Sequence, residues 1–136
     1  MNESEQTLSI IKPDAVERNL QNEIKNEFNK NGFVISKEKK IHISKQEAEQ
    51  FYKVHETKPF YNDLCEYLSS GPIIVMSLQK KNAVLDNRKL MGATNPKEAE
   101  KDTLREKYGI SIDKNSVHGS DSIENAKIEI DFFFKD

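Results

Sequence analysis

Cysteine is almost absent from this sequence of 136 residues. Its single thiol, Cys65, cannot form an internal disulfide or a cysteine-rich zinc site. The composition therefore favours a reducing compartment, and we predict a cytoplasmic protein. The apolar neighbours of Cys65 predict that this thiol is an inert part of the core.

Long hydrophobic runs are also absent. The longest uninterrupted apolar segments lie at residues 72–76 (PIIVM) and 132–134 (FFF), far short of the roughly 20 residues that a membrane-spanning helix requires. The first residues (MNESE) are polar and acidic, whereas a secretory signal begins with positive charge and continues with an apolar segment. The sequence predicts neither a membrane span nor export.

No excess of charge points to a polyanionic partner. Lys and Arg number 21 against 23 Asp and Glu, for a formal net charge of −2, so neither nucleic acid nor an anionic membrane is an expected partner. The densest basic run, residues 37–40 (KEKK), is typical of the solvent-exposed side of an edge strand.

The length predicts a single domain over residues 1–136, because one compact domain usually has about 100 to 150 residues. The high charged fraction of 32% raises the question of disorder. The apolar residues are nevertheless strongly patterned, and this patterning argues for a folded chain.

The first half of the sequence predicts two strands around a helix. Residues 7–11 (TLSII) indicate a buried strand, and Pro13 suits the first turn of a following helix. We expect this helix to continue to Asn31-Gly32 because it carries one apolar stripe at four-residue steps: Val16, Leu20, Ile24 and Phe28. Residues 33–43 then predict a second strand that is polar on one side.

The remaining elements follow from capping, periodicity and turn residues. Ser44 and Glu47 form a capping-box pattern that predicts a helix over residues 44–55, before Pro59 interrupts it. Further elements are expected as a helix at 60–68, a strand at 73–78, a helix at 82–91, a loop at 92–101, a short strand at 111–117 and a helix at 121–134. This order predicts an α/β sandwich with helices covering a small sheet.

The segment most informative about function is residues 115–126 (NSVHGSDSIENA). One interpretation is purely structural: Gly119 makes a turn, Asp121 and Glu124 cap the next helix, and His118 is incidental. The other is catalytic, because the turn would expose an imidazole beside a helix start, where phosphate is favoured. Imidazole can act as an uncharged nucleophile near neutral pH.

Other residues could complete such a site. Glu129 lies on the predicted final helix, from which a carboxylate could reach back and orient the imidazole. Cations and a hydroxyl that could hold a polyphosphate are Lys12, Arg88, Thr94 and Arg105. Each cation alone is typical of an ordinary surface charge. Neither a Walker loop nor a kinase-type glycine-rich loop is present.

Five segments, in order along the chain, resemble the nucleoside diphosphate kinase family. They are residues 10–14 (IIKPD), 58–61 (KPFY), 70–72 (SGP), 91–96 (MGATNP) and 115–126. The resemblance implies a ferredoxin-like α+β sandwich with a small antiparallel four-stranded sheet. It also implies Mg²⁺-assisted transfer of the γ-phosphate from a nucleoside triphosphate, mainly ATP, to a nucleoside diphosphate, by a ping-pong route through a phosphohistidine.

The resemblance also assigns roles to individual residues. His118 matches the phosphorylated histidine and Glu129 the carboxylate that orients it, while Tyr52 lies close to the transferred group. The residues implied to bind nucleotide are Lys12 and Asn115 at the ribose, His55 at an inner phosphate, Arg88, Thr94 and Arg105 at the terminal phosphates, and Phe60, Leu64 and Ile112 around the base. Gly119 and Ser120 support the histidine turn, and Asp121 holds Mg²⁺ through water.

An aromatic slot accepts any base, because every base has a π face, so a Phe60 slot predicts broad base specificity. Without the resemblance, Phe60 would be expected in the core. The family also assembles as tetramers or hexamers, so we expect a homo-oligomer whose size the sequence does not fix.

The sequence departs from the family pattern at two positions. Lys58 stands where many members have arginine, which replaces a planar fork with a point charge. Asp102 stands where glycine is frequent, which leaves the conformation of its loop open.

Two other functions remain alternatives at this stage. A non-catalytic ferredoxin-like module would bind nucleotide or protein without transferring phosphate. The simultaneous presence of His118, Lys12, Glu129 and their companions argues against it. A nucleic-acid-binding role has little support, since no basic face is apparent.

Overall fold

The computed structural model describes residues 4–112 and 114–134, which form a four-stranded antiparallel sheet with strand order β2-β3-β1-β4. The strands are β1 (Ser4–Ile11), β2 (Val34–Ile41), β3 (Ile73–Lys81) and β4 (Val117–Gly119). The α-helices are α1 (Pro13–Glu17), α2 (Gln21–Lys30), α3 (Lys45–Phe51), α4 (Tyr61–Leu68), α5 (Ala83–Met91), α6 (Leu104–Tyr108) and α7 (Ile123–Phe133). Two short 3-10 helices are η1 (Lys53–His55) and η2 (Pro96–Glu98). No helix among these residues is long and apolar enough to cross a membrane.

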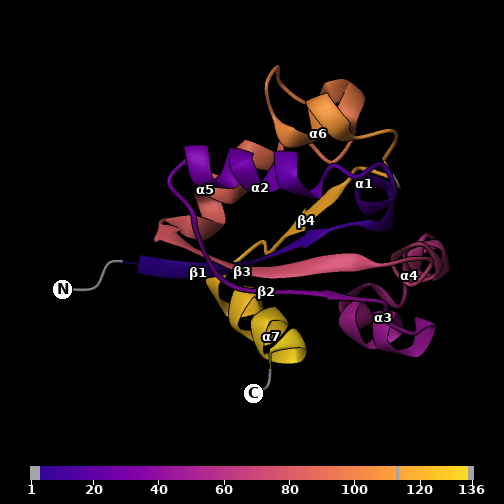
Figure 1. Ribbon diagram of the computed structural model, residues 1–136. Coiled ribbons are helices and arrows are strands. Elements are labelled where there is room, and N and C mark those ends of the chain that lie inside the picture. Colours follow the sequence, from indigo (N-terminus) through magenta and orange to yellow (C-terminus); the bar gives the residue numbers. More distant parts are fainter. Residues whose placement is uncertain (1–3, 113, 135–136) are drawn as a thin grey trace.

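Helices cover both faces of the sheet. Figure 1 shows α2 and α5 on one side and α3 and α7 on the other. Successive side chains of a strand point to opposite faces, so Ile11 packs with the α2 and α5 side, whereas Leu8 and Ile10 pack with α3, α4 and α7. The predicted ferredoxin-like α+β sandwich is confirmed.

Several local predictions are confirmed. The buried strand expected at 7–11 is the C-terminal part of β1, and the strand expected at 73–78 begins β3. Ser44 and Glu47 form the predicted capping box at the start of α3. The lysine-rich β2 lies at an edge of the sheet. Cys65 is a free, buried cysteine.

The single helix expected from Pro13 to Asn31-Gly32 is wrong. The chain forms α1 and α2 instead, and the break falls at Asn19, whose φ of 60° lies in the left-handed region. Asparagine tolerates this conformation better than most residues. The break keeps Val16 and Ile24 buried in one cluster, so the apolar stripe spans two short helices.

The strand expected at 111–117 is also misplaced. Of the described residues in that range only Val117 is in a strand, because β4 runs from Val117 to Gly119. The main-chain N–H groups of Ile110 and Ser111 both donate to Lys114 O, which makes a turn there. Helix α6, which precedes this turn, was not predicted and is capped by Thr103.

Candidate active site

Strand β4, at one edge of the sheet, places His118 beside β1. His118 pairs with Ile10 of β1, and its side chain remains 19% exposed. The adjacent Gly119 faces α5, where an added Cβ would lie 2.5 Å from Asn87 Nδ2 and 2.6 Å from Met91 Cε. Glycine therefore lets α5 pack closely on one face of β4 while the imidazole occupies the other.

Glu129 on α7 orients this imidazole. Its Oε1 lies 3.1 Å from His118 Nε2 and accepts a second hydrogen bond from Ser120 Oγ at 2.8 Å. Since Ser120 Oγ itself accepts the N–H of Leu8 at 3.1 Å, its own proton is available for the carboxylate. Glu129 thus acts as acceptor, and the arrangement favours the tautomer with the proton on Nε2. Nδ1, which has no hydrogen-bond partner among the described residues, then carries the lone pair.

Phe51 also contacts the imidazole, although the sequence did not suggest it. Its ring meets the His118 ring edge to face, with centroids 5.2 Å apart. Phe51 is the last residue of α3 and directly precedes Tyr52. In the sequence, the one feature that could have suggested this contact is that Phe51 directly precedes Tyr52, a predicted site residue. The contact walls one side of the imidazole with an apolar surface.

The end of β1 brings Lys12 to the same region. The Lys12 side chain is buried, and its Nζ donates to Asn115 Oδ1 at 2.9 Å. Asn115 in turn donates from Nδ2 to the main-chain oxygen of Thr94 at 3.1 Å. Three residues predicted to bind nucleotide are therefore joined by hydrogen bonds, although they lie far apart in the sequence.

Arg105 extends from α6 into the site. Its Nη1 donates to Gly92 O at 3.1 Å and its Nη2 to Val117 O at 2.9 Å, while Nε is buried and unpartnered among the described residues. Burial, together with the positive charge of Arg88, lowers the pKa of Arg105 to about 10. The guanidinium stays charged at neutral pH and lies close to a second cation. A bound anion would offset the repulsion between these two positive charges.

Aromatic rings line the approach to the histidine. The ring of His55 lies 6.2 Å from that of Tyr52 and 6.3 Å from that of Phe60, measured between centroids. Phe60 is 43% exposed, so the alternative of a core position is wrong, and Lys58 Nζ lies 5.7 Å from its ring centroid. Ile112 is likewise 54% exposed, and Leu64 is half-buried on α4.

Two of these aromatic side chains, Tyr52 and His55, have shifted pKa values. Burial and then the neighbouring Glu129 carboxylate raise the pKa of Tyr52, so its phenol keeps its proton at neutral pH. Burial and the positive charge of Lys58 lower the pKa of His55, while the nearby Asp121 carboxylate opposes the shift. His55 is therefore biased toward its neutral form.

Asp121 is the predicted contact for Mg²⁺. Its exposed carboxylate accepts a hydrogen bond from Asn125 Nδ2 at 2.6 Å. Among residues 4–112 and 114–134, no group of three or more His, Cys, Asp or Glu side chains could hold a metal ion by itself. Any divalent cation at this site would thus depend on oxygen ligands from a bound phosphate and from water.

Phosphoryl transfer is the chemistry that suits these side chains, because the candidate site combines buried cations and a phenol with an imidazole whose one nitrogen keeps a lone pair. The class is a phosphotransferase with a ferredoxin-like α+β fold. Residues 5–136 match the model of the nucleoside diphosphate kinase family, and the chain belongs to this family. Its function is that of a nucleoside diphosphate kinase.

Similar proteins agree with this assignment. A nucleoside diphosphate kinase of Campylobacter jejuni is 57% identical over 131 residues, covering 96% of each chain. One of Campylobacter lari is 58% identical over 130 residues, covering 96% of this chain and 95% of its own. The crystal structure of the Aquifex aeolicus nucleoside diphosphate kinase is 37% identical with a TM-score of 0.94, covering 96% of this chain and 95% of its own. The resemblance found in the sequence is confirmed.

Proposed function

We propose that His118 is the nucleophile of a ping-pong reaction and that residues 1–136 form one nucleoside diphosphate kinase domain around it. The observation that carries the proposal is the contact of His118 Nε2 with Glu129 Oε1, which leaves Nδ1 with its lone pair in a partly exposed side chain. In the first half-reaction, Nδ1 attacks the γ-phosphorus of a nucleoside triphosphate. A P–N bond forms, the P–O bond to the β-phosphate breaks, and the nucleoside diphosphate leaves with the bond's electron pair.

In the second half-reaction a different nucleoside diphosphate attacks the phosphohistidine through its terminal oxygen. The P–N bond breaks and its electron pair returns to Nδ1. Glu129 accepts a hydrogen bond from the Nε2–H group of His118 in both half-reactions. Its negative charge stabilises the positive charge that builds on the ring while Nδ1 is phosphorylated. One pocket serves both half-reactions, because donor and acceptor bind in turn.

The nucleotide would be held by the residues that surround His118. Lys12 and Asn115 would contact the ribose, and Lys12 would also reach the phosphate near the 3′ oxygen. Arg88, Thr94 and Arg105 would grip the terminal phosphates, His55 an inner phosphate, and Tyr52 would donate toward the transferred group. Phe60, Leu64 and Ile112 would sandwich the base without contacting its hydrogen-bonding edge, which supports broad base specificity.

Magnesium fits this arrangement as an ion carried by the nucleotide. Mg²⁺ keeps several waters and binds through substrate phosphates with one or two carboxylates, and a single exposed Asp121 suits contact through one of those waters. When bound, the ion would neutralise part of the polyphosphate charge. The protein's own cations supply the rest.

The cellular setting and assembly complete the proposal. We place the enzyme in the cytoplasm, in keeping with its free buried thiol. We also infer a homo-oligomer, either a tetramer or a hexamer. Association would bury apolar side chains that this protomer exposes, such as Val34 and Ile128.

Labelling tests the proposed function directly. The protein is incubated with Mg²⁺ and γ-labelled ATP, and the label is expected on the protein in an acid-labile form that then passes to GDP, CDP and UDP. His118→Ala should abolish labelling. His42→Ala is a matched control, since His42 follows β2, at the opposite edge of the sheet from β4, and its Nε2 contacts the main-chain oxygen of Ser69. Normal labelling of His118→Ala, or none of the unmodified protein, would overturn the proposal.

A further inference from the structure

The chain makes an unusual turn immediately before β4. The N–H of Val117 donates to Asn115 O at 2.9 Å, and Ser116 between them has φ 74°. A hydrogen bond across three residues with a positive φ at the centre defines the rare, strained form of γ-turn. Such strain persists only where surrounding structure holds it. This turn joins Asn115 to the strand that carries His118.

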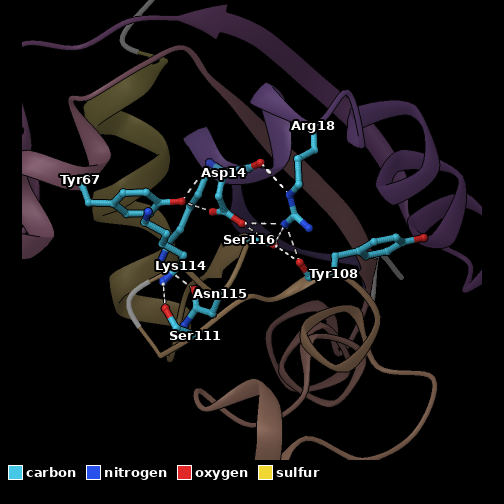
Figure 2. A network of polar contacts seen from close by, with 9 residues as sticks. Asp14, Arg18, Tyr67, Tyr108, Ser111, Lys114, Asn115 and Ser116 are labelled. Atoms are coloured by element: carbon cyan, nitrogen blue, oxygen red, sulfur yellow. Dashed lines mark hydrogen bonds and ion pairs between the residues drawn. The ribbon is translucent and has the colours of Figure 1, made fainter.

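A buried carboxylate holds the centre of the turn. The buried Ser116 Oγ has two acceptors in reach, Asp14 Oδ2 at 2.7 Å and the main-chain oxygen of Tyr108 at 2.9 Å, and it accepts a hydrogen bond from Arg18 Nη2 at 3.1 Å. Its single proton favours the carboxylate, which is the nearer acceptor and the charged one. Asp14 is only 5% exposed and lies at the start of α1, about a hundred positions earlier in the chain. Figure 2 shows its carboxylate between Tyr67 and Arg18, with Ser116 directly beneath. A hydrogen bond to a charged acceptor is stronger than one between neutral groups, so Asp14 is a firm anchor for the serine hydroxyl.

Asp14 is itself fixed by partners from separate elements. Tyr67 of α4 donates its hydroxyl to Asp14 Oδ1 and accepts the Asp14 N–H at 2.9 Å. Arg18 donates from Nη2 to Asp14 Oδ2 at 3.0 Å and from Nε to Asp14 O at 3.0 Å. The arginine neutralises the buried charge, and the tyrosine sets the carboxylate's orientation.

The same turn contacts the proposed site on both of its sides. The N–H of Lys12 donates to Ser116 O at 2.8 Å, while the Lys12 ammonium holds the Asn115 amide. Arg105 donates to the carbonyl of Val117. If Ser116 turned to a negative φ, the peptide groups on either side would reorient, and Lys12, Asn115 and Arg105 would all lose a main-chain or side-chain partner.

We propose that Asp14 and Ser116 are positioning residues for phosphoryl transfer. The Asp14 carboxylate holds the Ser116 hydroxyl and so keeps the γ-turn in its strained form. This turn fixes the relative positions of Asn115, Lys12 and His118. This inference rests on the proposed function, in which those three residues act on the nucleotide. Neither Asp14 nor Ser116 contacts the imidazole, and their effect passes through the backbone of residues 115–118.

Two substitutions at Ser116 distinguish the effect of losing the hydroxyl from the effect of the strained backbone conformation. Ser116→Ala removes the hydroxyl with its contacts to Asp14, Tyr108 O and Arg18, and leaves a side chain that disfavours positive φ. Ser116→Gly removes the same contacts but accepts positive φ at no steric cost. Single-turnover phosphorylation of His118 by ATP is measured by rapid quench. We expect Ser116→Ala to be about tenfold slower, since small misplacements cost rate steeply, and Ser116→Gly to stay within about threefold of the unmodified protein. Ser36→Ala, which removes a serine hydroxyl from the exposed strand β2, is the matched control and should leave the rate unchanged.

A double-mutant cycle tests the link to Asp14. If Asp14 acts through the serine hydroxyl, Asp14→Asn combined with Ser116→Ala should be no slower than the slower single variant. Equal slowing of Ser116→Ala and Ser116→Gly, full activity of Ser116→Ala, or additive effects in the cycle would each overturn the inference. If Asp14→Asn does not fold, the two Ser116 variants decide alone.

A measurement independent of activity keeps this inference distinct from the proposed function. The backbone coupling constants of residue 116 report φ by NMR, and we expect positive φ in the unmodified protein and in Ser116→Gly but not in Ser116→Ala. Retention of positive φ in Ser116→Ala would show that the hydroxyl is not what holds the turn. Failure of the unmodified protein to acquire label would remove the proposed function while leaving the NMR result intact.

Discussion

Arg105 donates from Nη2 to the carbonyl of Val117 at 2.9 Å, one residue before His118. A helix that the sequence did not reveal, α6, therefore braces the strand that carries the proposed nucleophile. The other arm of the same guanidinium holds Gly92 O, at the end of α5. One side chain thus connects α6 with the end of α5 and with β4, and brings a positive charge to the candidate site.

Replacing Arg105 by lysine should damage both roles. Lysine keeps the charge but has no planar fork, so it cannot donate to Gly92 O and Val117 O in the same geometry. We expect phosphate transfer to ADP to fall by at least about tenfold, because each lost charge-assisted hydrogen bond contributes roughly 1.5–3 kcal/mol. Steady-state kinetics with GTP as donor measures this. Lys107→Arg on the exposed side of the same helix is the control, and equal activity of Arg105→Lys and the unmodified protein would contradict the assignment.

Glu129→Gln should slow catalysis far more than it weakens binding. The amide keeps the shape of the side chain but removes the charge that stabilises the ring while Nδ1 is phosphorylated. We expect kcat to fall on the order of 10²-fold or more, by analogy with other carboxylate–histidine pairs, with KM for ATP little changed. Glu124→Gln, an exposed change in the first turn of the same helix, should behave like the unmodified protein. A loss confined to KM would mean that Glu129 acts on nucleotide binding instead.

Gly119→Ala should destabilise the fold through overpacking. The new Cβ would lie 2.5 Å from Asn87 Nδ2 and 2.6 Å from Met91 Cε, so α5 must move or the strand must shift. The expected cost is about 1–3 kcal/mol of unfolding free energy, measured by urea denaturation. Gly71→Ala offers a matched comparison, since its Cβ would meet only Pro13 Cβ at 3.7 Å. Similar stability losses in the two variants would refute the packing argument.

Asp102→Gly should stabilise the protein. Asp102 has φ 73°, a conformation that glycine adopts without steric cost. We expect the unfolding free energy to increase by about 0.5–1 kcal/mol. Glycine removes the cost of holding a side chain at positive φ, and its larger loss of backbone entropy on folding offsets part of that gain. Thermal melting measures it. Asp86→Gly, inside α5, should do the opposite, and a lower midpoint for Asp102→Gly would show that contacts of its side chain outweigh the strain.

His55 should make stability fall as the pH drops. Burial and Lys58 lower the pKa of His55 in the folded state, so the unfolded chain takes up a proton first as the pH falls below about 6.5. Protonation then favours the unfolded state, so the free energy of unfolding falls. The decrease is complete once the pH lies below the pKa of His55 in the folded state. Urea midpoints at pH 7.5 and 5.5 should separate more in the unmodified protein than in His55→Gln. An identical separation in both would mean that His55 titrates normally.

The sequence was sufficient to propose most side chains of the candidate site but not to predict their contacts. Glu129 was correctly expected on the last helix, and α7 brings it to His118. The turn expected at His118 is wrong, because His118 and Gly119 belong to β4, which pairs with β1. Lys12 and Asn115 stand at opposite ends of the chain, and their hydrogen bond exists because β4 pairs with β1. No local pattern encodes that pairing.

The errors share one physical cause. Asn19 and Ser116 both have positive φ without being glycine. Asparagine tolerates this conformation but does not require it, and serine does not favour it, so the sequence does not locate the break between α1 and α2 or the strained turn before β4. Each conformation is favoured only once distant elements have packed around it. At Ser116, for example, the anchor is Asp14.

The sequence by itself determined the type of most elements, the apolar faces that they bury and the chemical groups available for phosphate. These depend on the spacing of residues a few positions apart, which any single stretch of chain carries. The tertiary structure alone decided where β4 begins, that α6 braces it through Arg105, and which imidazole nitrogen keeps its lone pair. Those outcomes depend on groups that meet only after the sheet has formed, because hydrogen bonds between distant residues select among conformations that are locally close in energy.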